Sequence, residues 1–132
     1  ICDYHNLKRG KDIQLSDGYI LKNENLTKPA EPSVSYAFCS DTGYLESIIP
    51  IIKNVDVLYH ESTFLHDLKK MADYTGHTTA LEAAKIARKA NVKKLILGHF
   101  SNRYNDLSVF LNEACEIFPE TYLPEQLEAV KI

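Results

Sequence analysis

The chain has 132 residues, of which 45% are hydrophobic, so it is long enough for one globular domain with its own core. Its formal net charge of −3 argues against a general nucleic-acid-binding protein, so an RNA ligand would require a local basic patch. No apolar run approaches the roughly 20 residues of a membrane span, which predicts no membrane partner. Three cysteines without a Cys-x-x-Cys pair argue against a disulfide framework, and free thiols predict a cytoplasmic location.

Residues 1–33 have the least regular pattern, and they predict an irregular lead-in with one hairpin. Two short apolar runs flank the Asp-Gly pair at 17–18, a dipeptide typical of tight hairpin turns. The following residues, 22–33, contain two prolines and predict a loop. Because the chain begins with Ile1 rather than methionine, we expect it to be a piece of a longer protein.

Residues 34–132 alternate between strand-like and helix-like patterns. Runs rich in β-branched and aromatic residues predict strands, and apolar residues three or four apart predict helices. Thr79 and Glu82 form a capping-box pattern at the start of the most regular helix, and Pro50 interrupts the first helix. The predicted strands cover 34–39, 55–59, 94–97 and 127–132, and the predicted helices cover 45–52, 64–73, 79–90 and 107–118. This alternation predicts an α/β fold of βαβ units with a mostly parallel sheet.

Reactive side chains follow the predicted strands at the point where each strand ends. Asp41 follows the first strand of this set, Glu61 the second and His99 the third. The carboxyl ends of parallel strands share one edge of the sheet, where open α/β sheets bind ligands. His77 lies in a loop after Gly76, and the spacing alone leaves open whether this loop reaches the same edge.

Each of these side chains taken alone has a common structural explanation. An aspartate after a strand is often a turn or cap residue, and Glu61 by itself predicts a surface ion pair. Taken together, the groups favour a metal-hydrolase site. Asp41 and His99 are then candidate metal ligands, and Glu61 with His77 is a candidate pair for proton transfer.

The segment after the third strand adds groups that suit a phosphate. Gly98 is expected to let the backbone turn, Ser101 offers a hydroxyl, and Arg103 offers a planar guanidinium. Two further histidines, His5 and His66, have no reactive neighbours in the sequence and are expected on the surface.

Four segments, in this order, resemble the C-terminal motifs of ribonuclease Z, the tRNA 3′-processing endonuclease family of the metallo-β-lactamase superfamily. They are Ser40–Thr42, His60–Phe64, Gly76–Ala80 and His99–Tyr104. Any one of them is unspecific, but the ordered set is specific. The resemblance implies half of a four-layer αββα sandwich, in which 1–33 is the lead-in and 34–132 the core of one metallo-β-lactamase-like domain.

The resemblance also implies roles for the candidate residues. Asp41 would bridge two zinc ions, and His99 would bind the second of them. Glu61 and His77 would protonate the leaving 3′ oxygen of precursor tRNA after attack by a metal-activated water. The positions implied near the scissile phosphate are Ser101 and Arg103. A homodimer is typical of the complete enzyme.

The family's main metal motif, His-x-His-x-Asp-His, is absent from this sequence. We therefore interpret the chain as a C-terminal half whose partner is an N-terminal half carrying that motif. A catalytic zinc site keeps about three protein ligands, and Asp41 with His99 supplies two of them. The isolated chain is thus expected to lack a complete dinuclear zinc site and to be inactive.

Two other functions stay open. The chain could belong to a different metallo-β-lactamase-fold phosphodiesterase or arylsulfatase that acts on a smaller ester. It could also be a non-catalytic α/β interaction module that keeps these motifs as relics, although all four reactive groups are chemically intact.

Overall fold

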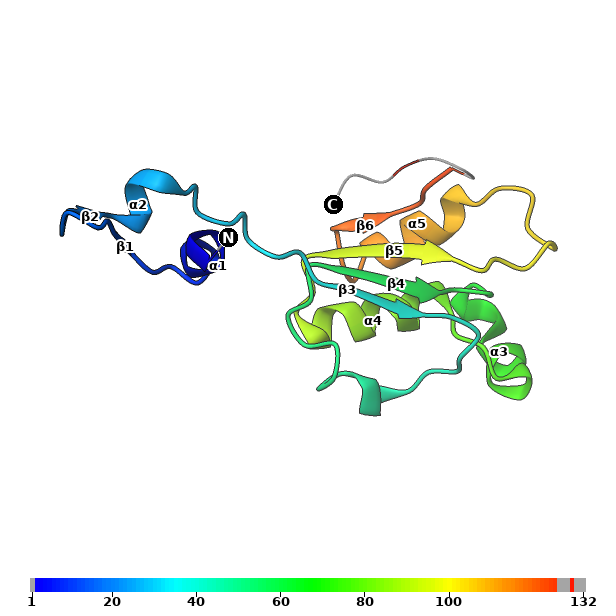
Figure 1. Ribbon diagram of the computed structural model, residues 1–132. Coiled ribbons are helices and arrows are strands. Elements are labelled where there is room, and N and C mark those ends of the chain that lie inside the picture. The colour runs from blue at the N-terminus through cyan, green and yellow to red at the C-terminus, as the bar shows by residue number, and fades with distance from the viewer. Residues whose placement is uncertain (1, 126–128, 130–132) are drawn as a thin grey trace. The chain divides into compact units, whose positions relative to one another are not determined.

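The computed structural model describes residues 2–125 and 129, and it divides into two compact units, 1–33 and 34–132 (Figure 1). Within the described residues, no helix combines the length and apolar character needed to cross a membrane.

The first unit contains the predicted hairpin between two short helices. The elements are α1 (Cys2–Lys8), β1 (Ile13–Gln14), β2 (Ile20–Leu21) and α2 (Asn23–Leu26). The strands β1 and β2 pair antiparallel, and Gly18 takes the positive φ of 86° that the turn requires. Neither helix was predicted, because segments this short carry little periodic signal.

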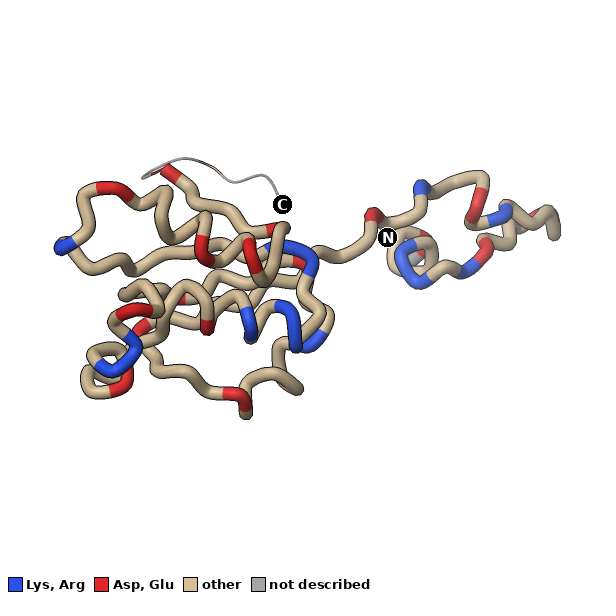
Figure 2. The backbone as a smooth tube through the Cα atoms, turned by 180° about the vertical axis from the view of Figure 1, so that it is seen from behind, with Lys and Arg blue, Asp and Glu red and all other residues tan. Residues whose placement is uncertain are grey.

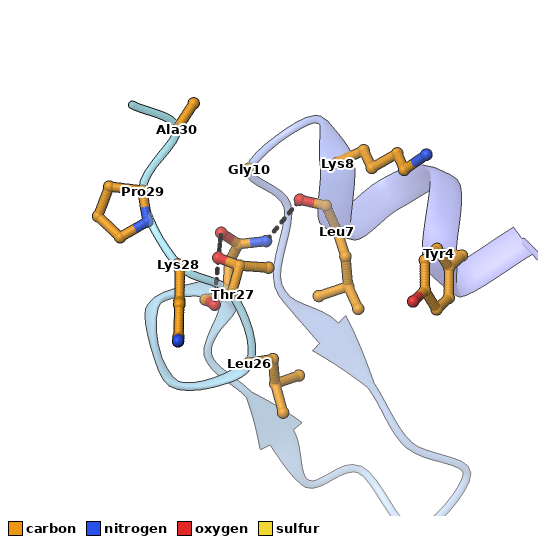
Figure 3. Close-up of a pocket in the computed structure, with 10 residues that line it drawn as sticks. Tyr4, Leu7, Lys8, Gly10, Leu26, Thr27, Lys28, Pro29 and Ala30 are labelled. Carbon is orange, nitrogen blue, oxygen red and sulfur yellow. Dashed lines mark hydrogen bonds between the residues drawn. The ribbon is translucent and has the colours of Figure 1, made fainter. Parts of the chain in front are cut away.

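The side-chain amide of Asn23 holds the first unit together. Its nitrogen donates to the backbone carbonyl of Leu7 at 2.8 Å and to that of Lys11 at 3.3 Å. A pocket of about 450 Å³ lies beside this contact, and residues from both helices line it (Figure 3). The lining residues include Tyr4 and Leu26. Residues 22–33, expected to be only a loop, therefore begin with a helix that helps to form this pocket.

The second unit is built on a four-stranded parallel sheet, as the sequence predicted (Figure 1). The strands are β3 (Tyr36–Cys39), β4 (Val57–Glu61), β5 (Lys94–Gly98) and β6 (Thr121–Tyr122), which lie in that order across the sheet. In the register, Cys39 pairs with His60 and His60 with Leu97, so the carboxyl ends of three strands are level.

The helices α4 (Ala80–Ala90) and α5 (Ser108–Cys115) cover one face of this sheet and form the main core with it. The predicted capping box at the start of α4 is confirmed, with Thr79 as N-cap and Glu82 as its partner. Alanines on the buried side of α4 allow a close approach to Leu58, Leu95 and Leu97 of the sheet. The remaining helical segments are η1 (Glu46–Ile48), η2 (His66–Leu68) and α3 (Lys69–Thr75).

The opposite face of the sheet leaves aromatic side chains exposed in this chain. Successive side chains of a strand point to opposite faces, so Ala37 and Cys39 face the helices, whereas Tyr36 and Phe38 face away. Tyr36 is 52% exposed and Phe38 is 64% exposed. Phe38 stacks on Tyr59 of the next strand, with ring centroids 4.6 Å apart.

Four predicted elements differ from the structure. The helix predicted over 64–73 begins only at His66, as the single turn η2, and continues as α3 to Thr75. Of the helix predicted over 45–52 only a short first piece forms, the single turn η1, and it ends before Pro50, which cannot donate a helical hydrogen bond. The helix over 107–118 ends early, at Cys115. The strand predicted over 127–132 lies outside the described residues, except for Ala129, which is not in a strand. The fourth strand is instead the two-residue β6, too short for a periodic signal.

Candidate metal centre

Four side chains predicted as site residues meet at the carboxyl edge of the sheet. One possible ligand atom from each of Asp41, Glu61, His77 and His99 lies within 4.8 Å of the others. Asp41 follows β3, Glu61 ends β4 and His99 follows β5, so the level strand ends bring three of them together. Within the part of the chain that the structure describes, this is the one group of its kind.

Two of these residues have a left-handed backbone, which turns the chain sharply where a strand ends. Asp41 has φ of 53° and His99 has φ of 59°. Asp and His tolerate this region better than most residues, although it still carries some strain for any side chain with a Cβ. The expectation that Gly98 makes the turn is wrong, because Gly98 is the last residue of β5 and the turn occurs at His99.

Gly98 is required for another reason. A Cβ built at this position would overlap the hydroxyl and ring of Tyr59, which crosses it on the open face of the sheet. The glycine therefore makes room for the aromatic pair of Tyr59 and Phe38 beside the site.

Glu61 is the buried centre of the cluster. It is fully buried, so the surface ion pair that a glutamate by itself would suggest does not form. Its Oε1 accepts from the backbone amide of Thr42 at 2.6 Å and lies 3.0 Å from Nδ1 of His77. Its Oε2 accepts from the Thr63 hydroxyl at 2.6 Å and from the backbone amide of Thr78 at 3.2 Å. Burial alone would raise the pKa of this carboxyl group, but these hydrogen bonds outweigh burial, so the pKa lies below its ordinary value.

His77 reaches the edge through the loop that the sequence left open. The helix α3 ends at Gly76, whose φ of 75° reverses the chain. His77 then lies with Nδ1 3.0 Å from Glu61 and 3.7 Å from Asp41, and its ring centroid is 5.3 Å from that of His99. A buried carboxylate beside Nδ1 orients the ring.

Thr63 is a contact residue that the sequence analysis missed. Its hydroxyl oxygen lies 2.6 Å from Glu61 Oε2, 2.9 Å from His99 Nδ1 and 3.3 Å from His77 Nδ1. The available signal was its position two residues after Glu61, because alternate residues of an extended segment point to the same side.

Ser101 and Arg103 lie on the loop that follows His99, beside the cluster. The backbone amide of Ser101 donates to the carbonyl of Thr63 at 3.1 Å. The Nε of Arg103 donates to the Ser101 hydroxyl at 3.1 Å, and the guanidinium lies 5.0 Å from the centre of the Phe64 ring. These contacts orient an exposed guanidinium next to the cluster. Tyr104 belongs to the core instead, because its ring packs edge-on against Phe110.

The other histidines have different environments. His60 is fully buried on the helix side of β4, and its Nδ1 lies 2.8 Å from the carbonyl of Glu61. Burial lowers the pKa of His60 below its ordinary value. The surface position expected for His66 is wrong, since it is half-buried with Nδ1 3.1 Å from the Thr79 hydroxyl. His5 is exposed, as expected.

The donor set fits a metal ion, but incompletely. The Asp41 side chain is 77% exposed and the His99 side chain 42% exposed, so both have open sides for a ligand. Glu61 has its oxygens occupied by hydrogen bonds, which makes it an orienting group rather than a free ligand. Carboxylate and imidazole are the donors that zinc accepts, and such a site needs about four ligands. The two open donors therefore form part of a site that other residues must complete.

The sequence comparisons give a consistent family. No family model matches the chain. It is 44% identical to Ribonuclease Z of Bacteroides thetaiotaomicron over all 132 residues, which make up 42% of that relative. It is 51% identical to Ribonuclease Z of Cytophaga hutchinsonii over 93% of this chain and 40% of that protein. The chain therefore spans about two fifths of the length of the curated relatives it matches.

Solved structures share the fold. The metallo-beta-lactamase fold protein YhfI from Bacillus subtilis superposes with a TM-score of 0.64 at 28% identity, over 69% of this chain and 37% of that one. A long form RNase Z from yeast gives a TM-score of 0.60 at 32% identity, over 67% of this chain and 12% of that one. Human tRNase Z, short form, gives 0.60 at 22% identity over 86% of this chain and 36% of its own, a likeness of fold alone. By sequence and by fold, this chain belongs to the ribonuclease Z family of metallo-β-lactamase-fold proteins and covers part of a family member's length.

Proposed function

We propose that this chain is the C-terminal portion of a zinc-dependent endoribonuclease that cuts precursor tRNA near its 3′ end. The observation that carries the proposal is the convergence of Asp41, Glu61, His77 and His99 within 4.8 Å at the strand ends. The family supports the reaction, because relatives called Ribonuclease Z match the chain over all or nearly all of its length. We place the complete enzyme in the cytoplasm as a homodimer.

In this proposal Asp41 and His99 hold zinc. When bound, the metal would lower the pKa of a water molecule and supply the attacking hydroxide. Two ions would require further ligands, which we assign to an N-terminal half that carries His-x-His-x-Asp-His. The exposed aromatic face of the sheet supports such a half, because a surface like that formed by Tyr36 and Phe38 normally packs against another layer.

Glu61 and His77 move the proton. The Glu61 carboxylate, 3.0 Å from Nδ1, orients the His77 ring, and Nε2 of that ring would give the proton to the departing 3′ oxygen. The lowered pKa of Glu61 fits this role, because an ionised carboxylate is the better acceptor for the hydrogen bond from Nδ1.

Ser101 and Arg103 position the phosphate. Since Nε of Arg103 is held by Ser101, the outer nitrogens of the guanidinium are left for phosphate oxygens. Many other basic residues lie elsewhere: Figure 2 shows a group at the end of α4 and the start of β5, away from the carboxyl ends of the strands. Contacts from the rest of the protein would have to add to this charge, and affinity should fall steeply with salt.

The test is cleavage of precursor tRNA by the full protein. His77→Ala should lower turnover by about 10²–10⁴-fold, the usual contribution of general acid–base catalysis. Asp41→Ala should abolish turnover and weaken zinc binding, whereas Asp67→Ala, at an exposed position outside the cluster, should change neither. Unchanged turnover in His77→Ala would leave a non-catalytic interaction module as the better explanation.

The isolated chain offers a second test. We expect calorimetric titration with zinc to show weak or partial binding, and we expect no cleavage of RNA. Tight binding of two zinc ions per chain would contradict the requirement for a second half.

The fold likeness to YhfI, a metallo-beta-lactamase fold protein, favours a second candidate function, which is hydrolysis of a smaller phosphate or sulfate ester. A full protein that turns over a small phosphodiester faster than precursor tRNA would favour this candidate.

A further inference from the structure

We infer that Thr63 is a positioning residue that fixes the proton of His99 on Nδ1 and so leaves Nε2 as the atom that binds a cation. The cation-binding part of this inference rests on the proposed role of His99. Thr63 is 7% exposed, so its hydroxyl is shielded from water, and the position of its one proton decides which neighbouring groups can donate to it.

The Thr63 hydroxyl has one proton and can accept hydrogen bonds through its oxygen. Its shortest contact, at 2.6 Å, is to Oε2 of Glu61. The same hydroxyl also lies 3.0 Å from the backbone carbonyl of His99, a second acceptor. An ionised carboxylate is the closer and the stronger acceptor of the two, so we assign the Thr63 proton to Glu61. If it pointed elsewhere, two oxygens without a proton between them would face each other at that distance, which is repulsive.

Once its proton is committed, the same hydroxyl can only accept from other groups. Nδ1 of His99 lies 2.9 Å from it, so this nitrogen must be the donor and must carry the ring proton. Glu61 Oε2 lies 3.9 Å from the same nitrogen and favours that arrangement electrostatically. In a neutral ring the proton on Nδ1 leaves the lone pair on Nε2, and a histidine ligand must offer a lone pair to a metal.

The second ring follows the same pattern. Nδ1 of His77 lies 3.0 Å from Glu61 Oε1 and 3.3 Å from the Thr63 hydroxyl, and both partners there are acceptors. Thr63 therefore links the metal-binding histidine and the proton-transfer histidine to one carboxylate. Its backbone carbonyl also accepts from the amide of Ser101, so it connects the loop that carries Arg103.

The experiment compares Thr63→Val, which keeps the shape and removes the hydroxyl, with Thr63→Ser, which keeps the hydroxyl. The matched control is Thr121→Val, another buried threonine whose hydroxyl donates only to a backbone carbonyl, that of Phe118. Ring nitrogen shifts of His99 are measured by two-dimensional ¹⁵N NMR in the full, metal-free protein at about pH 8, above the ordinary histidine pKa.

We expect wild type, Thr63→Ser and Thr121→Val to show the proton of His99 on Nδ1, and Thr63→Val to show a mixture of both tautomers. Zinc affinity, measured separately by competition with a chelator, should fall about 10–100-fold in Thr63→Val and recover in Thr63→Ser.

A wild-type signal with the proton on Nε2 would overturn the inference, and so would a folded Thr63→Val with unchanged tautomer or unchanged zinc affinity. If Thr63→Val does not fold, Thr63→Ala, which also lacks the hydroxyl, takes its place in both measurements. Because the tautomer is read without metal or RNA, a protein that shows the expected tautomer but cuts no RNA would count against the proposed function alone.

Discussion

One face of the four-stranded sheet is covered by α4 and α5, whereas the other leaves aromatic side chains exposed. At the end of β4, two neighbouring residues point to opposite faces: His60 to the helix side and Glu61 to the open side. His60 is a buried neutral group, while Glu61 gathers the polar site around it. The face that the helices cover therefore provides the packed core that supports the site, whereas the open face carries the reactive side chains.

The largest expected effect is on the free energy of unfolding, and it distinguishes the helix-covered face from the open face. Leu58→Ala removes a fully buried side chain on the helix side and should lower the free energy of unfolding by about 2–5 kcal/mol. Phe38→Ala, on the open face, should cost about 1 kcal/mol, mainly from its stacking on Tyr59. Urea denaturation of the chain measures both. Equal losses would mean that the open face is already packed in this chain.

A glycine substitution tests the close packing on the open face. Gly98→Ala should lower the free energy of unfolding by about 1–3 kcal/mol, because its Cβ would overlap the Tyr59 ring. The double variant Gly98→Ala/Tyr59→Leu should recover much of this loss. Gly43→Ala is the matched control, since its Cβ would meet its nearest atoms at an ordinary 3.6 Å. A Gly98→Ala protein as stable as the control would contradict the close approach.

The two neighbouring groups at the end of β4 predict how stability depends on pH. The pKa of His60 is lowered from 6.5 by burial, so below about pH 6.5 the unfolded chain binds a proton that the folded chain does not. The pKa of Glu61 is also lowered, from 4.5, which adds a second loss below about pH 4.5. Stability should therefore fall as pH decreases through both windows.

Denaturation midpoints between about pH 3 and pH 8 measure this dependence across both windows. Each group contributes at most about 1.4 kcal/mol per pH unit within its own window. His60→Phe should flatten the upper window and leave the lower one unchanged. A slope between pH 5 and pH 6.5 that persists in this variant would assign the upper window to another group.

The smallest expected effect concerns the cap of α4 on the helix side. Thr79→Ala removes the side chain that accepts from the backbone of Glu82 and should cost about 1 kcal/mol. Thr79→Ser keeps the hydroxyl and should retain most of the stability. Circular dichroism during thermal unfolding compares the two. A loss in Thr79→Ser equal to that in Thr79→Ala would show that packing of the methyl group, rather than capping, stabilises this helix start.

The sequence predicted much of the fold because the features involved are local. The capping box of α4, the Asp-Gly hairpin and three of the four strands appear where their patterns place them. Elements with too few residues for a periodic signal were missed, as β6 and α2 show. At 45–52 the apolar pattern predicted a helix interrupted at Pro50, and only the turn before Pro50 forms.

The candidate site was predicted only in part, because some of its residues follow from the order of the strands and others do not. Asp41, Glu61 and His99 could be grouped because parallel strands end at a common edge, a rule that needs only the order of strands. The approach of His77 could not be derived, because it depends on where α3 ends and how Gly76 turns the chain. Thr63 escaped notice because a threonine has no distinctive chemistry until its neighbours are known.

By itself the sequence determined which residues can carry chemistry and which strands they follow, since residue type and periodicity are properties of the chain. Only the tertiary structure decided that Glu61 is buried, that its oxygens are occupied and that one hydroxyl lies between it and two imidazole rings. Burial and hydrogen bonding depend on segments distant in the chain, and no local pattern encodes the distances between them.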